Sequence, residues 1–165
     1  MIADPLRRFL LPNPTRGFFL RLLIVVLTAV LLFTQVLIPL RIEGRSMEPT
    51  YRDGGFNFCW RGRYLFSEPR HGDVVVIRFA GRGVMLLKRV VALAGETVEF
   101  RDGVLVVDGR AIEEPYVQTA SDWRLAPRRV EPGKVYVVGD NRAVPMNQHS
   151  FGQVERQRII GGILW

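Results

Sequence analysis

The chain begins with a short polar segment, and one long apolar segment follows it. Residues 1–17 are polar and broken by prolines, whereas residues 18–40 are largely apolar. A transmembrane helix needs about 20 mostly apolar residues, so residues 18–40 predict one membrane-spanning helix, which Pro39 would end. The arginines that flank the start of the span are Arg7, Arg8, Arg16 and Arg21. Because basic residues favour the cytoplasmic side, residues 1–17 are predicted to be cytoplasmic and the rest of the chain extracytoplasmic.

The alternative for this segment is a cleaved signal peptide. The apolar run is long for a signal peptide, and no small-x-small cleavage site follows it. We therefore prefer an uncleaved anchor.

After Arg41 the pattern changes to short apolar runs separated by turn residues. Runs of this length that are rich in β-branched and aromatic residues predict strands. The predicted strands are residues 56–60, 73–79, 85–93, 96–100, 104–107, 134–138 and 159–164. Asp102-Gly103 between two of them is a strong hairpin signal. Residues 112–132 are polar and contain prolines, so residues 41–165 are predicted to form one mostly β domain with a small loop-rich cap.

Charge and cysteine content narrow the classes of function. The net charge is +7, but the basic residues are dispersed and several flank the span, so we expect no nucleic-acid binding. The single cysteine, Cys59, excludes an intrachain disulfide and is predicted to be a buried strand residue. The two histidines, His71 and His149, have no suitably spaced partners for a metal ion.

Lys88 is unusual because the chain otherwise uses arginine as its basic residue. Apart from Lys134 it is the only lysine, and it lies in an apolar run, residues 84–91. A buried lysine can lose its proton, whereas arginine stays charged. Lys88 is therefore a candidate general base, the alternative being a lysine that extends its amino group to solvent at the end of a strand.

Ser46 is the candidate nucleophile. It lies between a glycine and a proline just after the apolar span, a pattern that predicts a tight exposed turn. A serine hydroxyl is a weak nucleophile until a base takes its proton, and Lys88 could be that base. His71 and His149 are disfavoured as alternative bases, because a turn and a polar loop suffice to explain them. The sequence alone does not bring Ser46 and Lys88 together.

Four motifs follow one another along the chain. They are Ile42–Thr50 with Ser-Met-x-Pro-Thr, Arg70–Val76 with Gly-Asp-Val, Leu87–Glu96 with the lysine, and Gly139–Arg142. In this order they resemble the motifs of the type I signal peptidases, the membrane-bound serine peptidases with a Ser/Lys pair. The resemblance covers nearly everything after Arg41, and the apolar span fits it as well. Such ordered agreement is far more specific than a lone Ser-x-x-Pro.

The resemblance implies a fold like that of the signal peptidases and a role for each matching residue. Ser46 would attack the scissile carbonyl, Lys88 would take and return the proton, and the backbone N–H of Ser46 would line the oxyanion hole. Small pockets for an Ala-x-Ala substrate would be lined by Ile42, Met47 and Leu87. The residues that would support the site are Gly44, Asp140, Asn141 and Arg142. The resemblance implies no metal and no cofactor.

The last motif departs from the family pattern at three positions. Pro145 stands where the family usually has a serine that hydrogen-bonds the lysine. Asn147 and His149 replace an Asp/Arg pair that usually braces the site. Another group is then needed to orient Lys88.

The preferred hypothesis is a single-pass serine endopeptidase of the plasma (inner) membrane. Its partners would be the lipid bilayer and exported preproteins, from which it would remove signal peptides. One alternative is a specialised processing peptidase for a pilin-like or secretion-system substrate, and another is a non-catalytic membrane-tethered β domain. A LexA-type self-cleaving Ser/Lys repressor is disfavoured, because residues 18–40 form an apolar span where a DNA-binding helix pair should be.

Overall fold

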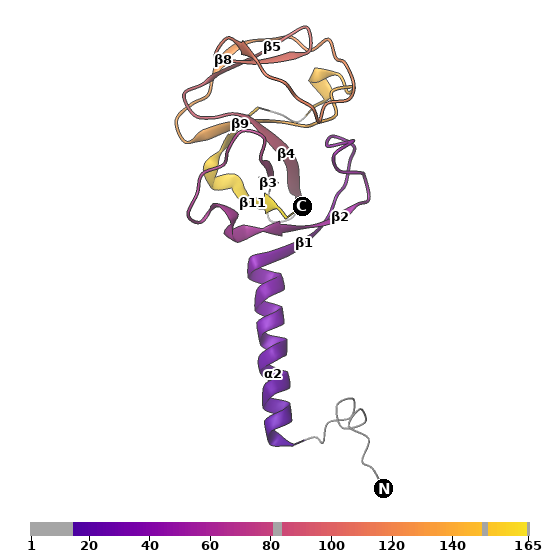
Figure 1. Ribbon diagram of the computed structural model, residues 1–165, viewed down its shortest axis with the longest axis vertical. Coiled ribbons are helices and arrows are strands. Elements are labelled where there is room, and N and C mark those ends of the chain that lie inside the picture. The colour runs from indigo at the N-terminus through magenta and orange to yellow at the C-terminus, as the bar shows by residue number, and fades with distance from the viewer. Residues whose placement is uncertain (1–14, 81–83, 150–151, 165) are drawn as a thin grey trace.

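The chain forms one long helix followed by two β-sheets (Figure 1). The computed structural model describes residues 15–80, 84–149 and 152–164. Most of the predicted cytoplasmic segment, residues 1–14, therefore lies outside the described residues.

Helix α2 spans Arg16–Leu31 and continues as the π-helical turn η1, Leu32–Val36. Thr15 caps its N-terminus, because the Thr15 Oγ1 accepts a hydrogen bond from the Phe18 N–H at 3.2 Å. None of residues 16–36 is buried, and the helix is apolar enough and long enough to cross a membrane. The prediction of one long apolar N-terminal helix is confirmed.

The helix ends earlier than the prediction placed it at Pro39. Leu37–Arg41 forms strand β1, which pairs antiparallel with β2, Phe56–Trp60. β1 is an edge strand, and an edge tolerates proline because its missing N–H breaks no interstrand bond there. The end of the predicted span 18–40 thus belongs to the β domain. Residues 37–40 directly continue the longer apolar run, and so short a segment has no hydrophobic periodicity that distinguishes a strand from a helix.

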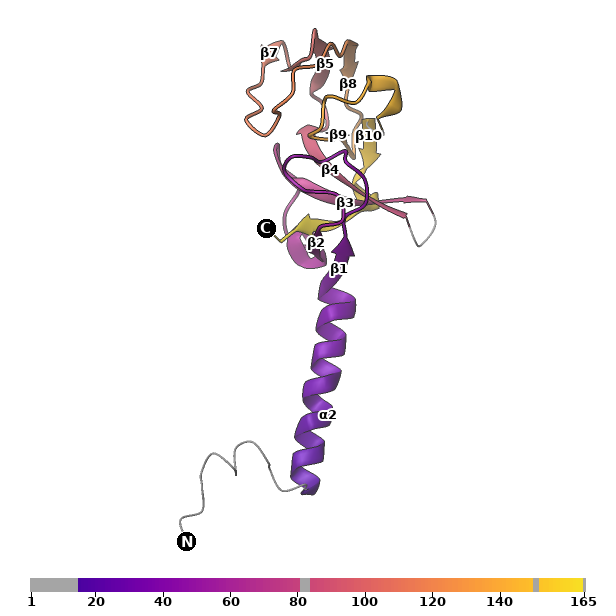
Figure 2. The same ribbon diagram turned by 90° about the vertical axis from the view of Figure 1, so that its right-hand side faces the viewer.

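The β part consists of a seven-stranded and a four-stranded sheet, whose strand pairs are antiparallel. The larger sheet has the order β1-β2-β11-β3-β4-β9-β10, and the smaller β7-β6-β5-β8. The other strands of the larger sheet are β3 Val74–Ala80, β4 Val84–Ala92, β9 Lys134–Val138, β10 Gly152–Glu155 and β11 Ile159–Ile163. Those of the smaller sheet are β5 Thr97–Arg101, β6 Val104–Val107, β7 Arg110–Ala111 and β8 Leu125–Arg129. The smaller sheet lies farthest from α2 (Figure 2), and the mostly β fold is confirmed.

The predicted strands are present, and four further strands were not predicted, namely β1, β7, β8 and β10. The hairpin between β5 and β6 is confirmed, with Asp102 and Gly103 at positive φ angles of 48° and 85°. β8 lies inside residues 112–132, where the prediction of loop structure is wrong. Only Leu125 of β8 is buried, and β8 is an edge strand that accommodates Pro127. It therefore lacks the apolar alternation that reveals a strand. β10 was also not predicted.

Strand β4 runs between two hydrophobic clusters. Val90 belongs to the cluster inside the larger sheet, and Val91 belongs to the cluster shared with the smaller sheet. Lys88 precedes these residues on the same strand, so packing on both sides fixes the backbone that carries it. The prediction that Cys59 is buried in a strand is also confirmed.

Candidate active site

Ser46 and Lys88 lie close together in the structure. Ser46 lies in a turn after β1, and Lys88 lies within β4 opposite Val75 of β3. The Lys88 Nζ and the Ser46 Oγ are 2.8 Å apart, which is a hydrogen-bond distance. The fold therefore brings together the two side chains that the sequence singled out.

Local contacts shape the turn that carries Ser46. Gly44 has a φ of +90°, a left-handed conformation that favours glycine. The Gly44 N–H donates a hydrogen bond to the Asp53 Oδ1 at 2.8 Å. The Tyr51 N–H donates to the Met47 carbonyl at 2.9 Å. These bonds close the loop around Ser46.

Lys88 has an electrostatic environment that favours the neutral amine. Its side chain is 3% exposed, and burial lowers the pKa of Lys88 from 10.5 to about 8, although the charge of Asp140 opposes this shift. Near pH 8 a large fraction of Lys88 is therefore neutral and able to accept a proton. A general base needs this property.

The segment after β9 holds the serine turn by its backbone. The Asn141 N–H donates to the Ser46 carbonyl at 3.0 Å. The Asn141 Nδ2 donates to the Arg45 carbonyl at 2.9 Å. A Cβ at Gly139 would lie 2.3 Å from the Ser46 carbonyl oxygen, so this close approach requires glycine. Asn141 thus contacts the turn, and its role as a supporting residue stays a prediction.

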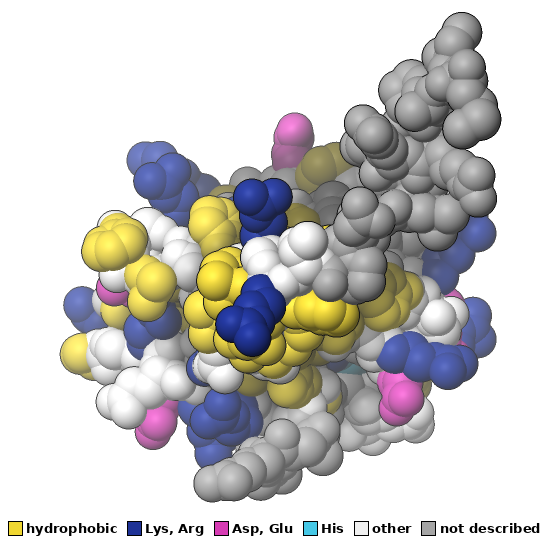
Figure 3. Space-filling model, turned by 90° about the horizontal axis from the view of Figure 1, so that it is seen from below, with side chains coloured by type: hydrophobic (Ala, Val, Ile, Leu, Met, Phe, Trp, Pro, Cys, Tyr) yellow, Lys and Arg dark blue, Asp and Glu magenta, His cyan; other side chains and the backbone are white. Residues whose placement is uncertain are grey.

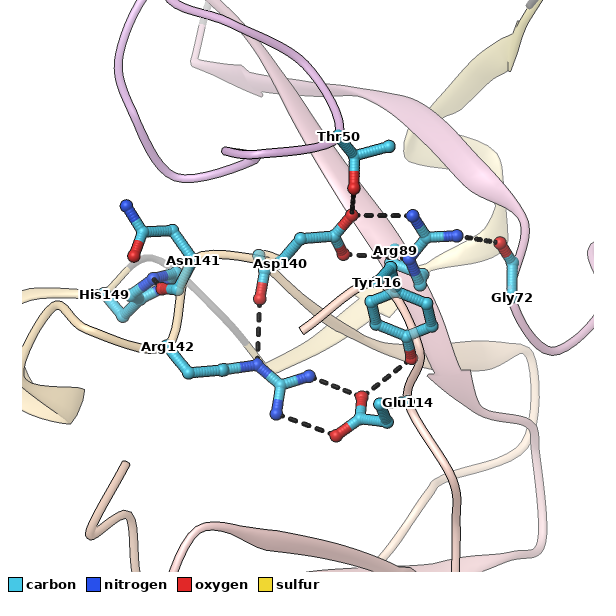
Figure 4. Close-up of polar contacts among 10 residues, drawn as sticks. Thr50, Gly72, Arg89, Glu114, Tyr116, Asp140, Asn141, Arg142 and His149 are labelled. Atoms are coloured by element: carbon cyan, nitrogen blue, oxygen red, sulfur yellow. Dashed lines mark hydrogen bonds and ion pairs between the residues drawn. The ribbon is translucent and has the colours of Figure 1, made fainter. Parts of the chain in front are cut away.

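Asp140 links three separate segments (Figure 4). The Arg89 guanidinium donates to both of its carboxylate oxygens, at 2.8 and 2.6 Å. The Thr50 hydroxyl donates to the Asp140 Oδ2 at 2.6 Å, and the Arg89 Nη1 donates to the Gly72 carbonyl at 2.7 Å. Asp140 is 1% and Arg89 9% exposed. This buried ion pair connects β4, the serine turn and the segment after β9.

Arg142 forms a second buried ion pair. Its guanidinium donates to Glu114 at 2.9 and 2.5 Å, and its Nε donates to the Gly139 carbonyl at 3.0 Å. The Tyr116 hydroxyl donates to Glu114 at 2.7 Å, and the Tyr116 ring stacks on the Arg89 guanidinium at 3.8 Å (Figure 4). The segment between β7 and β8 therefore braces both arginines.

Sequence reasoning missed four of these supporting residues. They are Thr50, Arg89, Glu114 and Tyr116. One signal was available, because a buried arginine needs an acidic partner. That rule does not identify which acid becomes the partner.

The candidate pocket residues lie around the pair. Met47 follows Ser46 and is 1% exposed, whereas Leu87 precedes Lys88 on β4 and is half-buried. Ile42 is buried, and its N–H donates to the Gly55 carbonyl at 2.8 Å. Their roles in substrate binding stay a prediction.

The remaining candidates occupy other positions. His71 is half-exposed and contacts Glu96 at 2.7 Å. Pro145 precedes a single turn of 3-10 helix, η3, Met146–Gln148, and the side chain of Asn147 is exposed. His149 is buried beside the segment that holds the serine turn. Among the residues that the structure describes, no three His, Cys, Asp or Glu side chains form a group that could hold a metal ion.

Comparisons with known proteins place this chain in a family. The sequence model of the family described as "Signal peptidase, peptidase S26" matches residues 15–165. Signal peptidase I of Bacillus licheniformis is 31% identical over 153 residues, which cover 85% of this chain and 81% of that protein. Probable signal peptidase I-1 of Synechocystis is 33% identical over 152 residues, covering 87% of this chain and 78% of that protein. The crystal structure of a signal peptidase I from Enterococcus faecalis has a TM-score of 0.49 and 24% identity, covering 58% of this chain and 97% of that one. This chain is a peptidase that belongs to the signal peptidase family, peptidase S26.

Proposed function

We propose that the chain is a membrane-anchored serine endopeptidase that removes signal peptides from exported preproteins. Ser46 is the nucleophile and Lys88 the general base. The observation that supports this assignment is the 2.8 Å distance between the Lys88 Nζ and the Ser46 Oγ. The lowered pKa of Lys88, about 8, is the second support, because the base must be neutral to act.

The reaction follows from this geometry. The neutral Lys88 amine takes the proton of the Ser46 hydroxyl as the Oγ attacks the scissile carbonyl. The backbone N–H of Ser46 donates to the developing oxyanion. The Lys88 ammonium then gives its proton to the leaving amine, which leaves an acyl group on Ser46. Lys88 next takes a proton from water as the water oxygen attacks the acyl carbonyl, and it returns this proton to the Ser46 Oγ as the bond from the Oγ to the acyl group breaks and the product leaves.

Specificity for small residues would come from apolar side chains beside the pair. Met47 and Leu87 neighbour the two reacting residues, and Ile42 is fixed by its backbone hydrogen bond to Gly55. Apolar bulk at these positions would leave room only for small side chains, as in an Ala-x-Ala substrate. An extended substrate would pair with the adjacent backbone as an added strand.

The pH dependence of cleavage tests the assignment of the base. Because only the neutral amine accepts the serine proton, kcat/KM for an Ala-x-Ala preprotein should rise with pH through about 8 and then level off. The baseline is Ser46→Ala, which should remain inactive at every pH. If His71 were the base, kcat/KM would instead rise at lower pH, near the ordinary pKa of histidine. This rise would disappear in His71→Ala. A rate that stays flat from mildly acidic to alkaline pH, with chemistry limiting, contradicts the proposal.

We also propose that the N-terminus is cytoplasmic and the β domain extracytoplasmic. Apolar side chains cover the helix in the view from below (Figure 3). Arg16 and Arg21 stand at the start of the helix, where basic residues favour the cytoplasmic side. A protease added outside intact cells should digest the β domain. Protection of that domain, when the same protease digests it after membrane disruption, contradicts this topology.

A further inference from the structure

The proposed mechanism needs a group that orients Lys88. A neutral amine has one lone pair and two N–H bonds, so an acceptor for one N–H directs the lone pair toward the serine hydroxyl. The side chain of Pro145 contains no hydrogen-bonding group, and the position where the family usually has its serine therefore supplies none. The orienting group must come from elsewhere in the site.

His149 lies beside the serine turn. A Cβ added at Gly139 would be 2.6 Å from the His149 Cε1 and 2.3 Å from the Ser46 carbonyl oxygen. The His149 imidazole and the Ser46 carbonyl therefore both pack against Gly139. The Trp123 ring contacts the imidazole edge-on at 4.9 Å between ring centroids, and His149 is 9% exposed. The ring is thus held in a fixed orientation.

The hydrogen bonds of His149 identify its tautomer. The Nε2 lies 2.7 Å from the carbonyl oxygen of Asn141, which can only accept a hydrogen bond. The Nε2 must therefore carry a hydrogen. In the neutral imidazole the Nδ1 then presents a lone pair. Within the described part of the chain this buried Nδ1 has no hydrogen-bond partner, and an unpaired buried acceptor calls for an explanation.

The charges around His149 keep the imidazole neutral. Burial lowers the pKa of His149, the hydrogen bond that its Nε2 donates to the Asn141 carbonyl opposes this shift, and the positive charges of Lys88 and Arg142 lower the pKa further. The guanidinium of Arg142 is already bound by Glu114 and by the Gly139 carbonyl. Lys88 is then the nearby basic group whose hydrogen bond with Ser46 leaves N–H bonds available.

We propose that His149 is the positioning residue for Lys88, its Nδ1 accepting a hydrogen bond from the Lys88 Nζ through one water molecule. The remaining lone pair of the amine then faces the Ser46 hydroxyl. The Nδ1 of His149 thus takes the role of the serine hydroxyl that the family usually has at the position of Pro145. This inference rests on the proposed roles of Ser46 and Lys88.

Two substitutions separate positioning from a merely structural role. In His149→Gln the side-chain amide reaches the place of the Nε2, so it can keep the bond to the Asn141 carbonyl while the acceptor at Nδ1 is lost. In His149→Asn the shorter amide lies near the place of the Nδ1, so the acceptor is kept and the bond to Asn141 is lost. If Nδ1 orients Lys88, His149→Gln should lower the single-turnover rate by about 10-fold to 100-fold, as for one lost hydrogen bond. His149→Asn should retain clearly more activity, despite a lower melting temperature.

A third substitution, Pro145→Ser, provides a rescue. Adding Pro145→Ser to His149→Gln returns a hydroxyl at the position where the family usually has one, and it should restore most of the lost rate. The pH at which the rate is half-maximal should shift in His149→Gln and return in the double variant, because the hydrogen bond to Lys88 alters its pKa. A purely structural histidine predicts neither change.

The outcomes distinguish this inference from the proposed function. If the unmodified protein cleaves no faster than Ser46→Ala, the dyad fails and the inference fails with it. If the unmodified protein is active but His149→Gln keeps its rate, only the inference is overturned. It is also overturned if His149→Gln is slow and Pro145→Ser restores nothing, or if His149→Asn loses more activity than His149→Gln. Circular dichroism of each variant confirms that a slow variant is folded.

Discussion

Lys88→Arg is expected to reduce single-turnover cleavage of an Ala-x-Ala preprotein by at least about 100-fold and up to about 10,000-fold. Arginine keeps the positive charge of lysine but does not lose a proton in a protein, so it cannot accept one from Ser46. Lys88 is buried and its pKa is about 8, so the rate should be lost through the chemistry rather than through binding. The measurement is the rate with enzyme in excess over substrate, where product release does not contribute.

The chain offers a matched control for this substitution. Lys134, the other lysine, pairs with Glu131 at the surface, so Lys134→Arg should cleave at the full rate. Lys88→Met removes the charge with little change in volume, and it tests whether the larger guanidinium simply distorts the strand. Both Lys88 variants should be inactive and folded. Near-normal cleavage by folded Lys88→Arg would exclude Lys88 as the base.

The sequence predicted the candidate pair, Ser46 and Lys88, because each member has a local signal. Ser46 lies in a turn between a glycine and a proline, and Lys88 is a lysine in an apolar strand of an arginine-rich chain. Both signals can be recognised from the sequence, because a turn and an apolar strand are specified mainly by residues close by in the chain. The 2.8 Å approach of the two side chains depends on the whole sheet, and the sequence alone did not predict it.

The supporting ion pairs lacked such local signals. Glu114 and Arg142 are 28 positions apart, and their contact depends on how the segment between β7 and β8 crosses the site. Nothing in the local sequence distinguishes Glu114 from Glu113, which precedes it. The end of the helix was misplaced for a related reason, since only the pairing of Pro39 with Phe58 across two strands reveals β1. Tertiary contacts determined these features.

Asp140→Ala is expected to lower the free energy of unfolding of the β domain by about 3–5 kcal/mol, because it leaves the buried guanidinium of Arg89 without its counter-charge. Typical domains are stable by about 5–15 kcal/mol, so the loss is a large fraction of the total. The substitution also removes the acceptor of the Thr50 hydroxyl. Chemical denaturation of the full chain in detergent, followed by near-ultraviolet circular dichroism, measures the change.

An exposed ion pair of the same kind provides the control for Asp140. Asp102 and Arg124 are 74% and 80% exposed in their side chains, and such pairs contribute about 1 kcal/mol or less. Asp102→Asn should therefore leave the unfolding transition almost unchanged, and asparagine tolerates the positive φ of 48° at this position. A loss in Asp140→Ala no larger than in Asp102→Asn would show that the buried pair does not support the fold.

A double variant separates the stability of the domain from the geometry of the site. Adding Arg89→Met to Asp140→Ala removes the second buried charge, so part of the lost stability should return. Cleavage should not return with it, because the carboxylate that joins β4 to Thr50 in the serine turn is still missing. Asn141, the next residue, holds the Ser46 carbonyl at 3.0 Å, and a shift of that contact would move the hydroxyl away from Lys88. Recovery of both stability and rate in the double variant would mean that Asp140 acts only on the fold.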